Sequence, residues 1–209
     1  GFRRDRCLLH FGAVDQECTV YLNDMELGSH VGGYLPFSFD VTEHLKETNT
    51  LRVIAFDPLD TDLPYGKQKK DRGGMWYTPV SGIWQTVWME SVPQQYIRGV
   101  KLEPNLDSVV ITVDGEGPFT VEFEGKIYRP KTARFRLRPE APRLWTLRDP
   151  HLYTVVVKNC DDAVETYFAL RTIESKKVDG VPRICLNGEP VFFHGMLDQG
   201  YWPDGLFLP

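Results

Sequence analysis

The chain has 209 residues, a net charge of −5, 42% hydrophobic residues and 25% charged residues, which is the composition of an ordinary globular protein. This length allows one large domain or two ordinary ones. An acidic chain lacks the basic face that a nucleic acid requires, and no apolar run is long enough to cross a bilayer, so nucleic acid and membrane are excluded as expected partners.

Strand-like segments dominate the first half of the chain. In residues 37–41 apolar and polar residues alternate, which places Phe37, Phe39 and Val41 on one face of a strand. Apolar runs and β-branched or aromatic residues predict further strands at residues 7–11, 18–22, 51–56 and 84–89. The one helical hint lies at residues 42–46, where Thr42 is predicted to cap a single turn.

A long connection without a regular pattern separates the strands predicted at residues 51–56 and 84–89. Connections of this length in compact domains are usually functional or disordered, and Trp76 and Tyr77 argue against disorder. Flat aromatic faces beside amide, carboxylate and phenol groups suit a sugar ring, and Gln68, Asp62 and Tyr65 would supply those groups. The alternative is that the two aromatic side chains fill an interdomain joint.

The pattern changes near residues 92–96, after which shorter and more regularly spaced strands are predicted at 109–113, 119–123, 126–128, 133–137, 152–157 and 164–170. Six or seven short strands joined by turns are typical of a small β-sandwich with immunoglobulin-like architecture. Further on, Asn187-Gly188 stands between two apolar runs, and this dipeptide is the strongest short-range signal for a β-hairpin.

The sequence predicts no catalytic residue, no metal ligand and no cofactor. It has no Gly-x-Ser-x-Gly motif and no glycine-rich phosphate loop, its histidines are scattered, and no Asp or Glu is singled out by apolar surroundings. Asp57, Asp60 and Asp62 could hold calcium, but a solvated acidic loop fits them better. The four cysteines lack zinc spacing and are expected to be buried free thiols, which favours the cytoplasm; export is the alternative if a signal precedes the chain.

Three sets of motifs resemble glycoside hydrolase family 2, which includes β-galactosidases, β-glucuronidases and β-mannosidases. Residues 9–15, 20–23, 28–42 and 81–88 resemble its N-terminal jelly-roll domain. Residues 144–153 and 168–173 resemble its immunoglobulin-like second domain, and residues 186–198 resemble the entry into its (β/α)8 barrel. The motifs occur in the order of the family.

The resemblance implies an all-β chain with three parts. Residues 1–93 would form a jelly-roll sandwich that lacks its first strands, residues 94–175 an immunoglobulin-like sandwich, and residues 176–209 a hairpin and the first strand of a truncated barrel. In this family both catalytic glutamates lie on later barrel strands, and the acid/base glutamate follows an asparagine. No Asn-Glu pair occurs in this chain.

We therefore expect the non-catalytic N-terminal portion of a retaining β-glycosidase, with a β-galactosidase favoured, that is inactive by itself. Its partners would be a terminal β-glycoside and its own catalytic barrel, and a homo-oligomer is compatible with the sequence. The family's pattern points to Trp76, Tyr77 and Asp198 as substrate-binding positions. A stand-alone carbohydrate-binding module and a purely structural scaffold are the alternatives.

Overall fold

The structure is a computed structural model that describes residues 5–64, 66–71 and 73–197. Within these ranges the chain is all-β, with eighteen strands and a single 3-10 turn, which confirms the predicted class. The described residues divide into two compact units: unit 1 ends at Val92 and unit 2 covers Pro93–Leu197. No helix in these ranges has the length and apolarity needed to cross a membrane.

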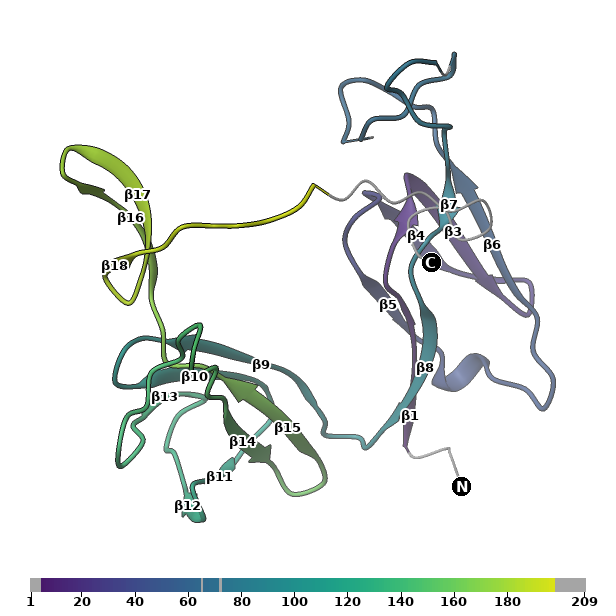
Figure 1. Cartoon of the computed structure of the whole chain (residues 1–209). Coiled ribbons are helices and arrows are strands. Elements are labelled where there is room, and N and C mark those ends of the chain that lie inside the picture. The colour runs from purple at the N-terminus through teal and green to yellow at the C-terminus, as the bar shows by residue number, and fades with distance from the viewer. Residues whose placement is uncertain (1–4, 65, 72, 198–209) are drawn as a thin grey trace. The chain divides into compact units, whose positions relative to one another are not determined.

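Unit 1 is built from antiparallel strands in three small sheets (Figure 1), which are ordered β5-β1-β8, β4-β3-β6 and β2-β7. The strands are β1 (Arg6–Phe11), β2 (Val14–Asp15), β3 (Glu17–Leu22), β4 (Met25–Val31), β5 (Phe37–Asp40), β6 (Leu51–Phe56), β7 (Gly82–Ile83) and β8 (Val87–Val92).

Alternation along two central strands forms the core of unit 1. In β1 the side chains of Cys7, Leu9 and Phe11 are buried, and in β3 those of Cys18, Val20 and Leu22 are buried while the intervening residues reach the surface. Successive side chains of a strand point to opposite faces, so each sheet contributes one apolar face to the core. The Phe11 ring stacks on Phe37 with centroids 4.9 Å apart.

Two local predictions for unit 1 are wrong, and one strand was missed. Thr42 does not cap the 3-10 turn η1 (Thr42–His44), because its Oγ1 accepts a hydrogen bond from the Cys7 amide at 2.9 Å. The strand predicted at 84–89 runs instead from Val87 to Val92, since Trp84 is held outside it by its indole N–H, which donates to Gly33 O at 2.7 Å. Strand β4 was not predicted because its sequence is polar and contains Gly28.

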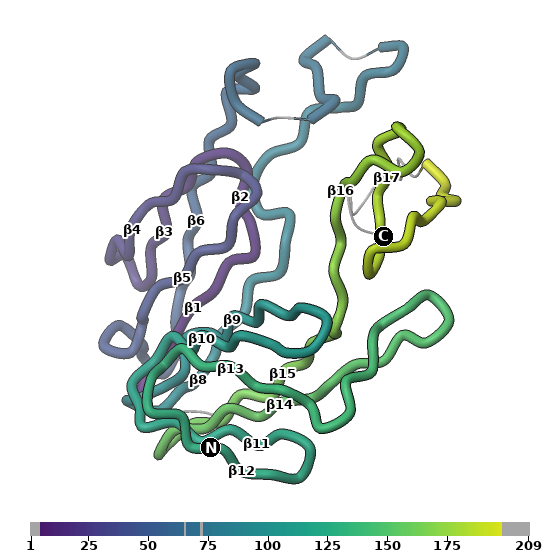
Figure 2. Tube along the Cα trace, turned by 90° about the vertical axis from the view of Figure 1, so that its left-hand side faces the viewer, coloured from purple at the N-terminus to yellow at the C-terminus, as the bar shows by residue number. Residues whose placement is uncertain are grey.

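Unit 2 contains a two-sheet sandwich (Figure 2), whose sheets are ordered β13-β10-β9 and β12-β11-β14-β15. Its strands are β9 (Ile97–Pro104), β10 (Val109–Gly115), β11 (Thr120–Phe123), β12 (Lys126–Tyr128), β13 (Arg134–Leu137), β14 (Tyr153–Lys158) and β15 (Ala163–Phe168). Strand β9 was not predicted, although Val100 and Leu102 alternate with Lys101 and Glu103 in the manner of a half-buried strand.

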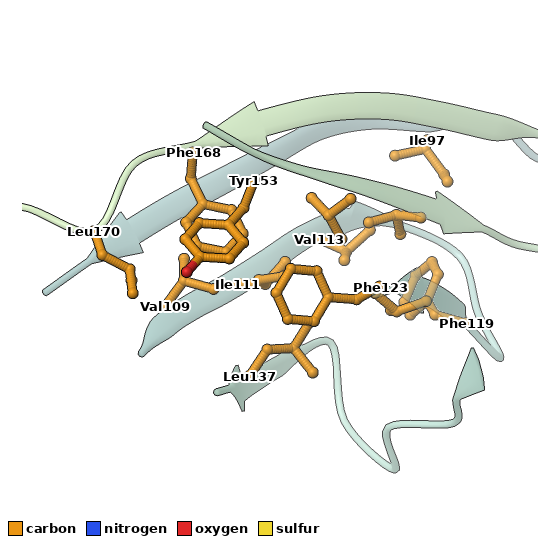
Figure 3. Close-up of a cluster of buried hydrophobic side chains, with 13 residues drawn as sticks. Ile97, Val109, Ile111, Val113, Phe119, Phe123, Leu137, Tyr153, Phe168 and Leu170 are labelled. Atoms are coloured by element: carbon orange, nitrogen blue, oxygen red, sulfur yellow. The ribbon is translucent and has the colours of Figure 1, made fainter. Parts of the chain in front are cut away.

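Aromatic side chains fill the centre of this sandwich (Figure 3). Tyr153 and Phe168 stack with centroids 5.3 Å apart, and Phe123 lies 5.9 Å from Tyr153 and 5.8 Å from Phe168. The Tyr153 hydroxyl accepts a hydrogen bond from the Arg143 amide at 2.7 Å, so the polar end of this buried ring is satisfied.

A third sheet follows the sandwich and contains β16 (Ile173–Val178), β17 (Val181–Leu186) and β18 (Glu189–Pro190). The β16–β17 ribbon projects from the sandwich (Figures 1 and 2). Asn187 and Gly188 connect β17 to β18 with φ values of 52° and 83°, so the predicted hairpin is confirmed, although its second strand is shorter than expected. Strand β16 was not predicted, because polar residues separate its apolar ends.

Candidate functional site

The segment between β6 and β7 is the main candidate site, and it extends beyond the ends of the sheets of unit 1 (Figure 1). It has little regular structure, but hydrogen bonds fix its central part. The Tyr77 amide donates to Lys67 O at 2.9 Å and the Lys69 amide donates to Tyr77 O at 3.3 Å, which forms a parallel bridge between Gln68 and Tyr77. We call residues 57–81 the aromatic loop.

Gln68 is the internal anchor of the aromatic loop. Only 3% of its surface is exposed, and its Oε1 accepts a hydrogen bond from the Val80 amide at 2.5 Å. A buried amide side chain needs such partners, because an unsatisfied one costs free energy. The bond therefore joins the middle of the aromatic loop to its end.

Trp76 forms part of the wall of a pocket in this loop. The pocket has a volume of about 410 Å³ and is lined by Leu59, Thr61, Gln68, Lys69, Lys70, Asp71 and Trp76. The Trp76 side chain is 39% exposed, and Lys69 Nζ lies 5.7 Å from its ring centroid. An aromatic face beside hydroxyl, amide and charged groups matches the C–H face and hydroxyl rim of a sugar ring.

The other residues predicted for this site have different environments. Tyr77 does not line the Trp76 pocket; it is half-buried, and Lys67 Nζ lies 6.0 Å from its ring. Asp62 is exposed and also does not line the pocket. Tyr65 and Asp198 lie outside the described residues.

Local hydrogen bonds account for two of the acidic residues of the loop. Asp57 Oδ1 accepts a hydrogen bond from the Leu59 amide at 2.9 Å, and Asp60 Oδ1 accepts one from the Asp62 amide at 2.9 Å. These contacts between residues i and i+2 are Asx turns, which shape a loop without any ligand. In the part of the chain that the structure describes, no three His, Cys, Asp or Glu side chains are grouped so that they could hold a metal ion.

A buried carboxyl group near the aromatic loop was missed by the sequence analysis. Asp15 ends β2 and is only 7% exposed. Burial, followed by the nearby carboxylate of Asp57, raises the pKa of Asp15. The pKa of Tyr34 is also raised, by burial first and then by Asp15 and Asp57, so the three groups form one cluster.

Gly33 allows this cluster to form, because a Cβ at that position would overlap Asp15 Oδ1. The indole of Trp84, which donates to Gly33 O, also meets the Tyr34 ring edge-on at 5.8 Å. The expectation that no carboxylate has apolar surroundings is thus wrong for Asp15. The signal for it was its place directly after Ala13 and Val14, both of which are fully buried.

Replacing Asp15 with asparagine is expected to stabilise unit 1 at neutral pH. A raised carboxyl pKa means that the folded state binds the proton more tightly than the unfolded state. Ionised Asp15 therefore lowers the free energy of unfolding at pH 7. This destabilisation disappears as the pH falls through the pKa of the folded state towards the ordinary value of 3.8, because Asp15 is then protonated in both states. Urea unfolding of Asp15→Asn and the unsubstituted chain should differ at pH 7 and converge near that value.

A Glu47→Gln variant, in an exposed turn, provides the matched control for the loss of one negative charge. This variant should leave the difference in unfolding free energy between pH 7 and pH 4 unchanged from that of the unsubstituted chain. Equal or lower stability of Asp15→Asn at pH 7 would contradict the assignment of Asp15 as a destabilising buried carboxylate.

The first part of the chain matches a known family. Residues 2–102 match the family model described as glycosyl hydrolase 2 galactose-binding domain-like. This part of the chain is therefore a domain of the glycoside hydrolase 2 type.

Relatives that cover both units carry two activities in their names. A β-galactosidase of Thermoanaerobacter pseudethanolicus is 26% identical over 93% of this chain and 29% of its own length. A β-glucuronidase of Streptococcus agalactiae is 24% identical over 91% of this chain and 36% of its own length. The chain thus spans about a third or less of these relatives.

Solved structures agree with this assignment. The β-glucuronidase from Ruminococcus gnavus in complex with D-glucuronic acid superposes with a TM-score of 0.72 and 26% identity. The match covers 93% of this chain and 38% of that enzyme. The two units and their order therefore resemble an enzyme that is much longer than this chain.

Proposed function

We propose that this chain is the non-catalytic N-terminal portion of a longer retaining β-glycosidase that removes terminal β-linked sugars. The observation that carries the proposal is the family 2 match together with similarity over nine-tenths of the chain to enzymes of about three times its length. Catalysis would then depend on two carboxylates in the remaining part of the enzyme, because a retaining mechanism needs a nucleophile and an acid/base group at a fixed separation.

The substrate of the longer protein is proposed to be a β-galactoside or a β-glucuronide. The sequence alone favoured the galactoside, whereas the relatives support both sugars equally. Hydrolysis of nitrophenyl β-galactoside and nitrophenyl β-glucuronide by the longer protein tests the proposal and separates the two. If the longer protein released nitrophenol from neither glycoside, the proposal would be contradicted.

The aromatic loop is proposed to contribute to carbohydrate binding. Its support is the combination of a half-exposed Trp76 and a pocket of about 410 Å³ whose lining also includes Thr61 and Asp71. The hydroxyl of Thr61 and the carboxylate of Asp71 can accept hydrogen bonds from sugar hydroxyls while the indole face packs against the ring. Tyr77 stays a candidate through its backbone bonds to the same loop.

Replacing Trp76 with alanine in the longer protein is expected to raise KM about three- to tenfold and to change kcat little. Loss of one stacking surface removes roughly 0.5–1.5 kcal/mol of binding that ground state and transition state share. Steady-state kinetics with the preferred nitrophenyl glycoside measures this effect.

Trp88→Ala is the matched control, because Trp88 is also a half-exposed tryptophan of unit 1 but stacks on His10 in the sheet. Its KM should stay within twofold of the unsubstituted enzyme. Equal effects of the two substitutions would reduce the aromatic loop to a structural role. Saturable binding of a sugar to the 209-residue chain, lost in Trp76→Ala, would favour the alternative of a stand-alone binding module.

Unit 2 is proposed to support the catalytic domain. Apolar side chains remain exposed on and around the projecting sheet, including Leu147, Ile173, Ile184 and Phe193. They surround an apolar pocket of about 180 Å³ beside Trp145 and Arg171. Apolar groups gathered in this way usually mark a surface that another protein segment covers.

A further inference from the structure

Two positively charged lysines line the Trp76 pocket. Lys69 and Lys70 both line the pocket, and both side chains are exposed. Among the residues that the structure describes, neither ammonium group has a carboxylate within ion-pair distance. Lysines elsewhere do, as Lys158 with Glu122 at 2.5 Å and Lys101 with Glu103 at 3.1 Å illustrate.

Lys69 places its positive charge over the Trp76 ring. Its Nζ lies 5.7 Å from the Trp76 ring centroid, which is a cation–π distance. At an exposed site this contact is worth only about 0.5–1 kcal/mol, so the ammonium can turn to an anion without a large loss. Asp71 also lines the pocket, so the charged groups of its lining are two ammonium groups and one carboxylate.

The groups that line the pocket restrict which ligands can bind beside this charge. Leu59 and Trp76 provide apolar surface, while the Thr61 hydroxyl and the Gln68 amide provide polar groups. The buried Gln68 amide accepts the Val80 amide at 2.5 Å, so the segment that carries Lys69 is fixed from inside. A ligand of this pocket needs a flat apolar face, hydroxyl groups and a negative charge at its edge.

We propose that the Trp76 pocket binds an anionic sugar unit, with its ring against Trp76 and its acidic group beside Lys69 and Lys70. The shared chemistry is an anionic oxygen group on a pyranose, which either a uronic acid carboxylate or a sulfate ester supplies. This inference rests on the proposed function, because it assigns the ligand class of the same loop.

Three matched sugars test this proposal on the 209-residue chain. Methyl β-glucoside, methyl β-glucuronide and methyl β-glucoside 6-sulfate share one ring and differ only at the sixth carbon. Titrations followed by the NMR signal of the Trp76 indole N–H should give affinities in the millimolar range. At about 50 mM salt the anionic sugars should bind about fivefold more tightly than the glucoside, and about 0.5 M salt should remove most of the difference.

The charge variants decide which residues produce the preference. Lys69→Gln with Lys70→Gln should lower the affinity for the anionic sugars about fivefold, to that of the glucoside. Lys46→Gln with Lys131→Gln removes the same charge from exposed positions outside the pocket and should change nothing. Trp76→Ala should lower the affinity of the chain for all three sugars.

Each outcome has a defined meaning. Tighter binding of the glucuronide alone assigns a uronic acid, tighter binding of the sulfate alone assigns a sulfated sugar, and either supports the proposal. Equal affinity for the glucoside and both anionic sugars, or a preference that survives the Lys69 and Lys70 substitutions, overturns it. The proposed function fails on a different measurement, the absence of glycoside hydrolysis by the longer protein.

Discussion

Replacing Phe123 with alanine is expected to destabilise unit 2 by about 3–5 kcal/mol. Phe123 is only 2% exposed. Its ring centroid lies 5.8 Å from that of Phe168 and 5.9 Å from that of Tyr153 (Figure 3). Truncation removes buried apolar surface and leaves a cavity that the two remaining rings and the sheet strands can fill only in part. Such a loss is a large share of the stability of a domain of this size.

Urea unfolding measures this effect, with near-ultraviolet circular dichroism as the signal from the aromatic cluster. Phe192→Ala is the matched control, because Phe192 is 88% exposed in the same unit and its truncation should change stability by less than about 0.5 kcal/mol. Similar unfolding midpoints for Phe123→Ala and Phe192→Ala would contradict the position of Phe123 in the core.

Replacing Asn187 with alanine is expected to destabilise the attachment of the projecting sheet by about 2–3 kcal/mol. The Asn187 side chain accepts a hydrogen bond from the Thr172 amide at 3.1 Å and donates one to Trp145 O at 3.0 Å. Each bond contributes about 1 kcal/mol. The residue also has φ of 52°, which costs alanine a further ~1 kcal/mol.

Two further substitutions separate these contributions. Asn187→Gly keeps the positive φ and loses both side-chain bonds, while Asn187→Asp keeps the acceptor for Thr172 and loses the donor to Trp145. The destabilisation should therefore increase from Asp to Gly to Ala. Hydrogen exchange of the Thr172 amide gives the local signal, and unchanged protection in Asn187→Ala would show that Asn187 does not hold the sheet.

The sequence predicted the strands of the core because their residues are patterned locally. The β-branched and aromatic residues at 18–22 predicted a strand, and the structure forms β3 there and buries Cys18, Val20 and Leu22. Strands with polar sequences, such as β4 and β16, were missed because they contain too few apolar residues to show a strand pattern, although each pairs with a strand next to it in the chain. Thr42 shows a different limit, since its hydrogen-bond partner Cys7 is 35 residues distant.

The candidate site was predictable only in part. The length and aromatic content of the connection indicated the Trp76 loop, and the structure places Trp76 in the wall of a pocket. The buried carboxyl of Asp15 could not be found in the same way. Its burial depends on the approach of Gly33, and the shift of its pKa depends in part on Asp57; neither residue is near Asp15 in sequence.

We propose that these residues bind carbohydrate and support the catalytic domain, while another part of a longer glycosidase performs the chemistry. The most direct test compares the purified 209-residue chain with the longer protein on nitrophenyl β-galactoside and nitrophenyl β-glucuronide. We expect hydrolysis of at least one glycoside by the longer protein and none above background by the chain. Turnover by the chain alone, or no turnover by the longer protein, would contradict it.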